Sequence, residues 1–177
     1  MSARTGAHVV ELAAKADMGT PRNELVLVVG YDGSPPSQQA LEKAAELMEH
    51  RKGWLEVVFV AHTPTPAPFA PEAVAELRQV FDEESAELEA QAGSVLIHQP
   101  RHWRFQRRDG GVAGQLLAVA NELRCRYGQT KDIGIVVGAP AHRLHHVAGS
   151  VAASLARSSR FPVVVIPAAE RSAAVPS

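Results

Sequence analysis

The strongest constraint on the fold is a series of short, mostly β-branched apolar runs that alternate with stretches of helical periodicity. The runs are LVLVV at 25–29, LEVVFV at 55–60, IGIVVG at 133–138 and VVVI at 163–166. Continuous apolar runs of this length predict strands that are buried on both faces, as in a parallel sheet.

Residues 103–108, WRFQRR, follow a different pattern, because aromatic and polar side chains alternate along them. We expect Trp103 and Phe105 to face inward in an edge strand that charge protects from further pairing. The polar residues between them, which we expect to face out, are Arg104, Gln106 and Arg108. The same composition also suits single-stranded nucleic acid, with bases stacked on the aromatic rings. The need to cover the sheet with those rings favours the edge strand.

Apolar residues at helical spacing predict a helix in each gap between these strands. The four helices are expected at 35–51, from Pro71 onward, from Val112 to about Gly128, and at 149–159. This order calls for a five-stranded parallel, doubly wound α/β sheet with right-handed crossovers and helices on both faces. We assign the domain to residues 23–168 and expect flexible tails at 1–22 and 169–177.

Composition excludes several classes of protein. The chain has 177 residues, of which 46% are hydrophobic and 21% charged, as in one globular domain of ordinary size. A formal charge of −1 argues against a broad surface for nucleic acid. No apolar run approaches the ~20 residues that span a membrane. The single cysteine, Cys125, cannot form an internal disulfide. We therefore expect a soluble cytoplasmic protein.

The unusual side chains of the sequence follow the predicted strands, where ligands of doubly wound sheets bind. Asp32 and Ser34 follow the first strand, and His62 follows the second. Gly149 and Ser150 open the last helix, and the free N–H groups of such an opening suit a phosphate. A Gly-Ser pair also serves simply as a helix cap, so both interpretations remain open.

Two stretches of the sequence carry a family resemblance, VVGYDGSPPSQQALEKAAEL and VVGAPAHRLHHVAGSVAASLARSSRFPVVVIP. In both, the chain resembles the universal stress protein family in its small single-domain form. The resemblance covers about residues 23–168. It implies strand order 3-2-1-4-5, a fold of the adenine-nucleotide alpha-hydrolase type. It also implies an adenine nucleotide (ATP, ADP or AMP, with or without Mg²⁺) and a homodimer paired through residues 163–166. A role in the stress response without efficient catalysis would follow, with a further protein partner left open.

The resemblance carries over residue by residue. Asp32 matches the aspartate at the ribose and adenine end, and His62 falls near the adenine. Gly138 matches the first glycine of the pattern G-x-x-G-x9-G-[ST], whose last pair matches Gly149 and Ser150. The candidate nucleotide-binding residues are Asp32, Ser34, His62, Gly138, Ala141, Arg143, Gly149, Ser150 and Val151.

Two departures from the family pattern concern the phosphate loop. Ala141 stands at the second glycine, where a Cβ makes positive φ costly. Ten residues separate Gly138 from Gly149 where the pattern has twelve, which removes up to ~7 Å of reach. Arg143 is placed to compensate with its charge. The alternatives are an interaction protein with a degenerate phosphate loop and a slow ATPase or autophosphorylating protein with Ser150 as acceptor.

Other motifs weigh against enzymatic and metal sites. His142, His145 and His146 have a spacing that suits zinc on a helix, but no third ligand is nearby, so we assign no metal. The sequence has neither a Walker A motif nor GxGxxG, which argues against a dedicated NTPase or dinucleotide enzyme. Asp32 has no acidic neighbour of the kind that a phosphorylated aspartate needs. We expect a binding protein and not an enzyme.

Overall fold

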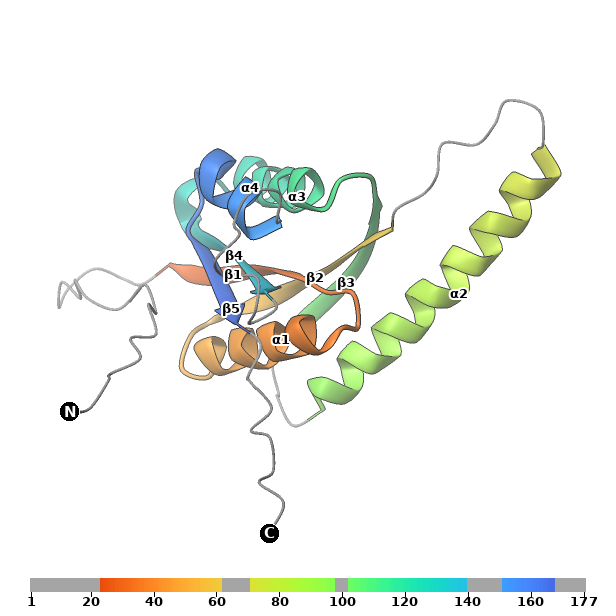
Figure 1. The fold of residues 1–177 in the computed structure, drawn as a ribbon. Helices are drawn as coiled ribbons and strands as arrows, with labels where there is room; N and C mark the ends of the chain where they lie inside the picture. The colour runs from red at the N-terminus through yellow and green to blue at the C-terminus, as the bar shows by residue number, and fades with distance from the viewer. Residues whose placement is uncertain (1–22, 62–70, 98–101, 140–150, 168–177) are drawn as a thin grey trace, which may run out of the picture.

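A five-stranded sheet with order β3-β2-β1-β4-β5 lies at the centre of the computed structural model, and all its strand pairs are parallel (Figure 1). The strands are Glu24–Gly30 (β1), Gly53–Ala61 (β2), His102–Asp109 (β3), Lys131–Ala139 (β4) and Val163–Pro167 (β5). The structure describes residues 23–61, 71–97, 102–139 and 151–167, and only the backbone of residues 71–78. The strand order and the edge position of β3 confirm the fold that the sequence predicts.

Helices cover both faces of this sheet (Figure 1). They are Pro35–Met48 (α1), Pro71–Val95 (α2), Val112–Tyr127 (α3) and Val151–Ser158 (α4), with a short 3₁₀ turn at Gly128–Thr130 (η1). One core lies between the sheet and α1 and α2, and a second lies between the sheet and α3 and α4. Successive residues of a strand serve opposite cores, so Leu27 packs toward α1 while Val28 packs toward α3.

Helix α1 starts as the sequence predicts and ends earlier. Ser34 is its N-cap, with an Oγ that accepts a hydrogen bond from the Ser37 N–H at 3.4 Å, and proline occupies the first position. The expected end at residue 51 is wrong, because the helix stops at Met48. After Met48 the backbone hydrogen bonds join residues only three positions apart. One of them runs from the Arg51 N–H to the Met48 carbonyl at 3.0 Å. The chain therefore tightens into turns before β2.

Strand β3 confirms one part of the predicted alternation and corrects another. Trp103 and Phe105 pack against the core beneath α1 and α2, as expected. Arg104 is exposed, but Gln106 and Arg108 do not point freely into solvent. Since α3 covers this face of the sheet, their polar groups need partners there, and they bond to carboxylates of β2 and α3.

No helix within the described ranges is both long and apolar enough to cross a bilayer. The tails expected at residues 1–22 and 169–177 lie outside the described residues.

Candidate functional site

A cavity of about 220 Å³ opens at the carboxyl ends of β1 and β4, on the side of the sheet that α3 and α4 cover. From β1 the chain continues to β2 on one side, and from β4 it continues to β5 on the other side. The carboxyl ends of β1 and β4 therefore form the switch point of the doubly wound sheet. The lining residues are Gly30, Tyr31, Asp32, Ser34, Pro36, Ser37, Val58, Val60, Val112, Val137, Gly138 and Val151.

The walls of this cavity are apolar. Val58 and Val60 come from β2 and Val137 from β4, all on the face that packs toward α3. Val112 opens α3 and Val151 opens α4, so two helix N-termini meet at the cavity. The result is an apolar slot lined by β-branched side chains, which suits an apolar group.

The mouth of the cavity is polar, and hydrogen bonds fix it. Asp32 Oδ1 accepts from the Ser34 hydroxyl at 2.5 Å and from the Ser34 N–H at 3.0 Å. The Asp32 N–H donates to Ser37 Oγ at 3.3 Å, and Ser37 Oγ donates to the Ser34 carbonyl at 2.9 Å. Gly33 forms the turn with φ +74°, a backbone conformation that residues other than glycine rarely adopt. The loop thus holds a carboxylate at the entrance before any ligand arrives.

The Asp32 carboxylate is held in its charged form. Partial burial at the cavity mouth raises the pKa of Asp32, but hydrogen bonds from the hydroxyls of Ser34 and Ser37 and from backbone N–H groups outweigh that effect. The pKa of Asp32 therefore lies below its ordinary value. Asp32 is available as a hydrogen-bond acceptor at neutral pH, in position to receive hydroxyl groups of a ligand.

Gly138 is required by packing at the end of β4. A Cβ at this position would lie 2.2 Å from the Pro36 carbonyl oxygen, in the first turn of α1. The absence of a side chain lets α1 approach the strand and brings its N-terminal loop over the cavity. This requirement holds whether or not a phosphate also approaches Gly138.

The structure brings together four of the residues that the sequence singled out. Asp32, Ser34, Gly138 and Val151 line one cavity, although they are spread over 120 positions of the chain. The remaining five, which lie outside the described residues, are His62, Ala141, Arg143, Gly149 and Ser150. The histidines considered for zinc, at 142, 145 and 146, fall there too.

Sequence reasoning missed most of the walls and Ser37. A usable signal was present, since alternation along the predicted strands places Val58, Val60 and Val137 on one face. Ser37 lies in the first turn of α1, where a small polar side chain can reach back to the loop.

The described lining has one negatively charged side chain and no positively charged one. Within the described ranges no three histidine, cysteine or acidic side chains group as metal ligands. What these residues can do is enclose an apolar group, accept hydrogen bonds from its polar rim and offer backbone N–H groups at the start of α4.

A doubly wound parallel sheet with a cavity at its switch point defines a class of α/β folds. Within that class, the sequence matches the universal stress protein family over residues 26–167. The chain belongs to this family. Among curated proteins, none matches the sequence significantly.

Solved structures share the fold. The universal stress protein UspA from Lactobacillus plantarum has a TM-score of 0.65 and 17% identity, over 82% of this chain and 99% of its own. A universal stress protein in complex with cAMP has a TM-score of 0.62 and 20% identity, over 84% and 100%. A family member from Arabidopsis thaliana with AMP bound has a TM-score of 0.57 and 13% identity, over 82% and 92%. At these identities the likeness establishes the fold.

Proposed function

We propose that the protein binds an adenine nucleotide in the cavity at the carboxyl ends of β1 and β4 and serves as a stress-response or regulatory module. One observation carries the proposal: an apolar slot and the preorganised Asp32 carboxylate adjoin at the switch point of the sheet. Two proteins of the same fold are complexes with cAMP and with AMP, which supports an adenine nucleotide as the ligand class.

Each part of a nucleotide has a counterpart among the described residues. Val58, Val60 and Val137 would enclose the base between apolar surfaces. Asp32 would accept hydrogen bonds from the ribose hydroxyls. The N–H group of Val151 and the positive end of α4 would face the phosphate.

The size of the cavity indicates which part of the ligand it encloses. Small-molecule sites usually measure about 300–1,000 Å³, whereas this cavity measures about 220 Å³. It therefore suits the nucleoside portion, with the phosphates extending toward the start of α4. On this basis AMP and ADP are as well suited as ATP, and Mg²⁺ would act only through the phosphates.

We further propose that the protein works by binding and not by efficient catalysis, as a homodimer in the cytoplasm. Strand β5 is an apolar edge strand whose residues Val163–Ile166 are only partly buried in the single chain. Such an edge can extend the sheet by pairing with a second copy.

A second candidate function is that of an interaction protein, which has the family fold, does not bind a nucleotide and binds other proteins. The observation that favours it is the absence of a cationic side chain among the described residues that line the cavity. A triphosphate with few cationic partners would be held weakly.

Backbone amide mapping separates the two functions. AMP is added to the isotopically labelled protein, and the amide signals of Gly30, Asp32, Val60 and Val151 are followed by NMR. Nucleotide binding predicts saturable shifts at these positions and small shifts for the exposed Val80 on α2. Unchanged amides around the cavity at millimolar AMP would contradict the nucleotide proposal and favour the second function.

A further inference from the structure

We propose that the protein carries a second small-molecule site, for a phosphate-bearing anion, at the amino ends of β1, β2 and β3. This edge of the sheet lies opposite the nucleotide cavity. The proposal does not depend on nucleotide binding, because the two cavities share no lining residue.

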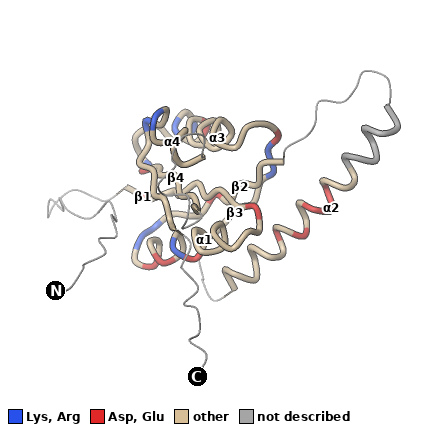
Figure 2. Tube along the Cα trace, in the orientation of Figure 1, with Lys and Arg blue, Asp and Glu red and all other residues tan. Residues whose placement is uncertain are grey.

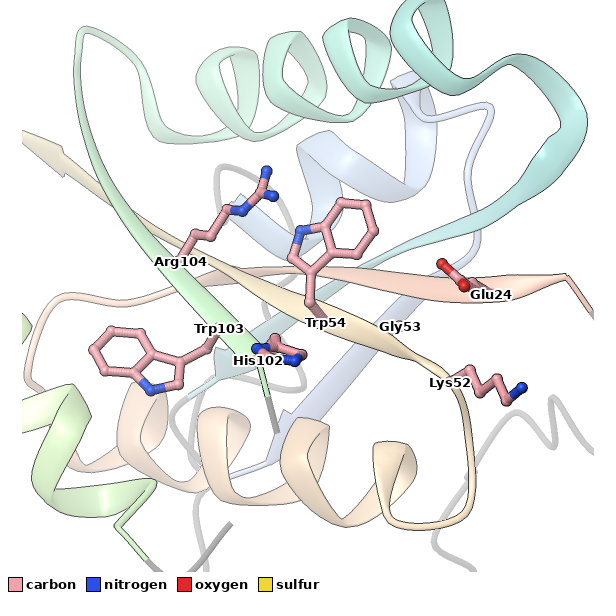
Figure 3. A pocket seen from close by; sticks show the side chains of 7 residues that line it. All are labelled: Glu24, Lys52, Gly53, Trp54, His102, Trp103 and Arg104. Carbon is pink, nitrogen blue, oxygen red and sulfur yellow. The ribbon is translucent and has the colours of Figure 1, made fainter. Parts of the chain in front are cut away.

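The site is a cavity of about 500 Å³, within the range usual for small-molecule sites. Its lining residues are Glu24, Lys52, Gly53, Trp54, His102, Trp103 and Arg104. Figure 3 shows Arg104 and Trp54 rising on the same side of the sheet, with His102 at the start of β3 and Lys52 in the turn before β2. His102 is the register neighbour of Trp54.

Arg104 is held in place by the Trp54 ring. Its guanidinium carbon lies 5.1 Å from the centroid of this ring, a cation–π contact, and the ring itself is buried. Glu56 is the register neighbour of Arg104, but its two carboxylate oxygens accept from Trp54 Nε1 at 2.9 Å and Gln106 Nε2 at 2.6 Å. Among the described residues no carboxylate forms an ion pair with Arg104, so its N–H groups remain available to a ligand.

The charge balance of the lining favours an anion. Lys52 and Arg104 carry positive charge, and the His102 ring adds an N–H donor. The only carboxylate in the lining, Glu24, is already paired with Lys131. The Lys131 ammonium lies 5.6 Å from the Trp54 ring centroid, but Lys131 itself does not line the cavity. The cavity therefore holds more positive than negative charge after its internal pairing.

A phosphate group fits these donors better than a carboxylate does. It offers three terminal oxygens and up to two negative charges, to which the Arg104 guanidinium and the His102 ring can donate, while Lys52 adds positive charge at the rim of the cavity. The volume leaves room for a small organic group beside the phosphate. Nucleic acid is disfavoured, because Trp103 packs on the core beneath α1 and α2 and lies beside Gly93 of α2. Its ring is thus engaged and not free to stack a base.

The intrinsic tryptophan fluorescence of the protein can be used to measure binding at this site, because both of its tryptophans line the cavity. Tryptophan fluorescence of the full chain is titrated with glycerol 3-phosphate, inorganic phosphate and, for comparison, acetate. We expect a saturable change with both phosphates that acetate does not reproduce. Arg104→Gln should weaken the phosphate affinity by about tenfold, as expected for the loss of a charged hydrogen bond. Lys52→Gln should weaken it by a smaller factor, because it removes only a positive charge at the rim.

Two control variants make the result decisive. Arg157→Gln removes the same charge from an exposed position on α4, which packs against β4 and β5 on the lateral side of the sheet away from β3, and should leave the affinity unchanged. Asp32→Ala alters the nucleotide cavity and should also leave it unchanged. The proposal is overturned if tryptophan fluorescence shows no saturable change up to about 10 mM phosphate, the concentration range of weak sites. It is equally overturned if Arg104→Gln and Arg157→Gln bind alike, if acetate responds as phosphate does, or if Asp32→Ala abolishes the signal.

Discussion

Asp32 illustrates at the residue scale how the site is built before a ligand arrives. The hydroxyl of Ser34 bonds to the carboxylate while also capping α1, and Ser37 bonds to the backbone on either side of the turn. A carboxylate fixed in this way loses little conformational freedom when it accepts a ligand hydroxyl.

The first prediction concerns the charge state of Asp32. Because hydrogen bonds outweigh burial, its pKa in the folded protein should lie below the ordinary 3.8. The stabilisation that this shift contributes is therefore complete above pH 3.8 and is lost as the pH falls through the folded-state value. A carbon-13 NMR titration of the carboxyl group measures the pKa directly. Ser34→Ala should raise it, and a midpoint at or above 3.8 in the native chain would contradict the hydrogen-bond account.

The second prediction tests the contact between β4 and α1. Gly138→Ala places a Cβ 2.2 Å from the Pro36 carbonyl oxygen, so the helix must shift. We expect unfolding free energy to fall by about 1–3 kcal/mol, the usual cost of overpacking. Urea denaturation measures this loss. The matched control is Gly114→Ala on α3, where a Cβ meets nothing within 4 Å and should be neutral or stabilising by up to about 1 kcal/mol. Equal effects of the two changes would exclude the packing role.

At the scale of elements, a polar chain joins β2, β3 and α3. Trp54 and Gln106 donate to the buried carboxylate of Glu56, and Arg108 links Gln106 to Glu122 on α3 through bonds of 2.8 Å and 2.5 Å. This chain ties an edge strand to α3, whose Val112 lines the cavity at the carboxyl ends of β1 and β4.

The third prediction concerns that polar chain. Glu56→Ala leaves the buried Trp54 indole N–H and the Gln106 carboxamide without their acceptor, which should cost about 2–3 kcal/mol of unfolding free energy. Glu122→Ala removes the exposed end of the same chain and should cost less than about 1 kcal/mol. Chemical denaturation of both variants provides the comparison. A loss no larger in Glu56→Ala than in Glu122→Ala would show that the chain contributes little.

The sequence predicts elements better than it predicts contacts between them. Continuous apolar runs identified four of the five strands, because burial on both faces leaves such a pattern, and the alternation of aromatic and polar residues identified the edge strand β3. The same patterns could not show that Gln106 and Arg108 bond to carboxylates, since Glu56 and Glu122 lie 50 and 14 positions away from them along the chain. For the site, Asp32 was found from its place after a strand, and Gly138 from its match to the family pattern. Alternation places the valines of the walls on one face of the sheet, but only the fold shows that this face and Ser37 meet at one cavity.

The whole molecule presents two opposite edges of one sheet with different chemistry. The carboxyl edge combines an apolar slot with a carboxylate, and the amino edge carries Lys52 and Arg104, with Arg104 stacked on the Trp54 ring. Figure 2 shows acidic positions along the described part of α2, which extends past the sheet. The lateral edge of the sheet at β5 remains apolar.

The fourth prediction is the assembly state. If β5 pairs with a second copy, sedimentation should give twice the 18.9 kDa of one chain. Ile166→Lys places a charge on the edge strand and should shift the protein toward monomer, with circular dichroism confirming the fold. Val80→Lys, on an equally apolar but distant exposed position of α2, should leave the mass unchanged. A monomeric native protein would contradict this assembly.

The central claim is that the cavity at the carboxyl ends of β1 and β4 binds an adenine nucleotide, and calorimetric titration with AMP tests it most directly. The account predicts one site per chain, with affinity reduced about tenfold or more in Asp32→Ala, because a charged acceptor is lost. Asp132→Ala removes an exposed carboxylate at the opposite edge and should bind as the native protein does. Absence of heat at millimolar AMP, or equal binding by the Asp32→Ala and Asp132→Ala variants, would contradict the claim.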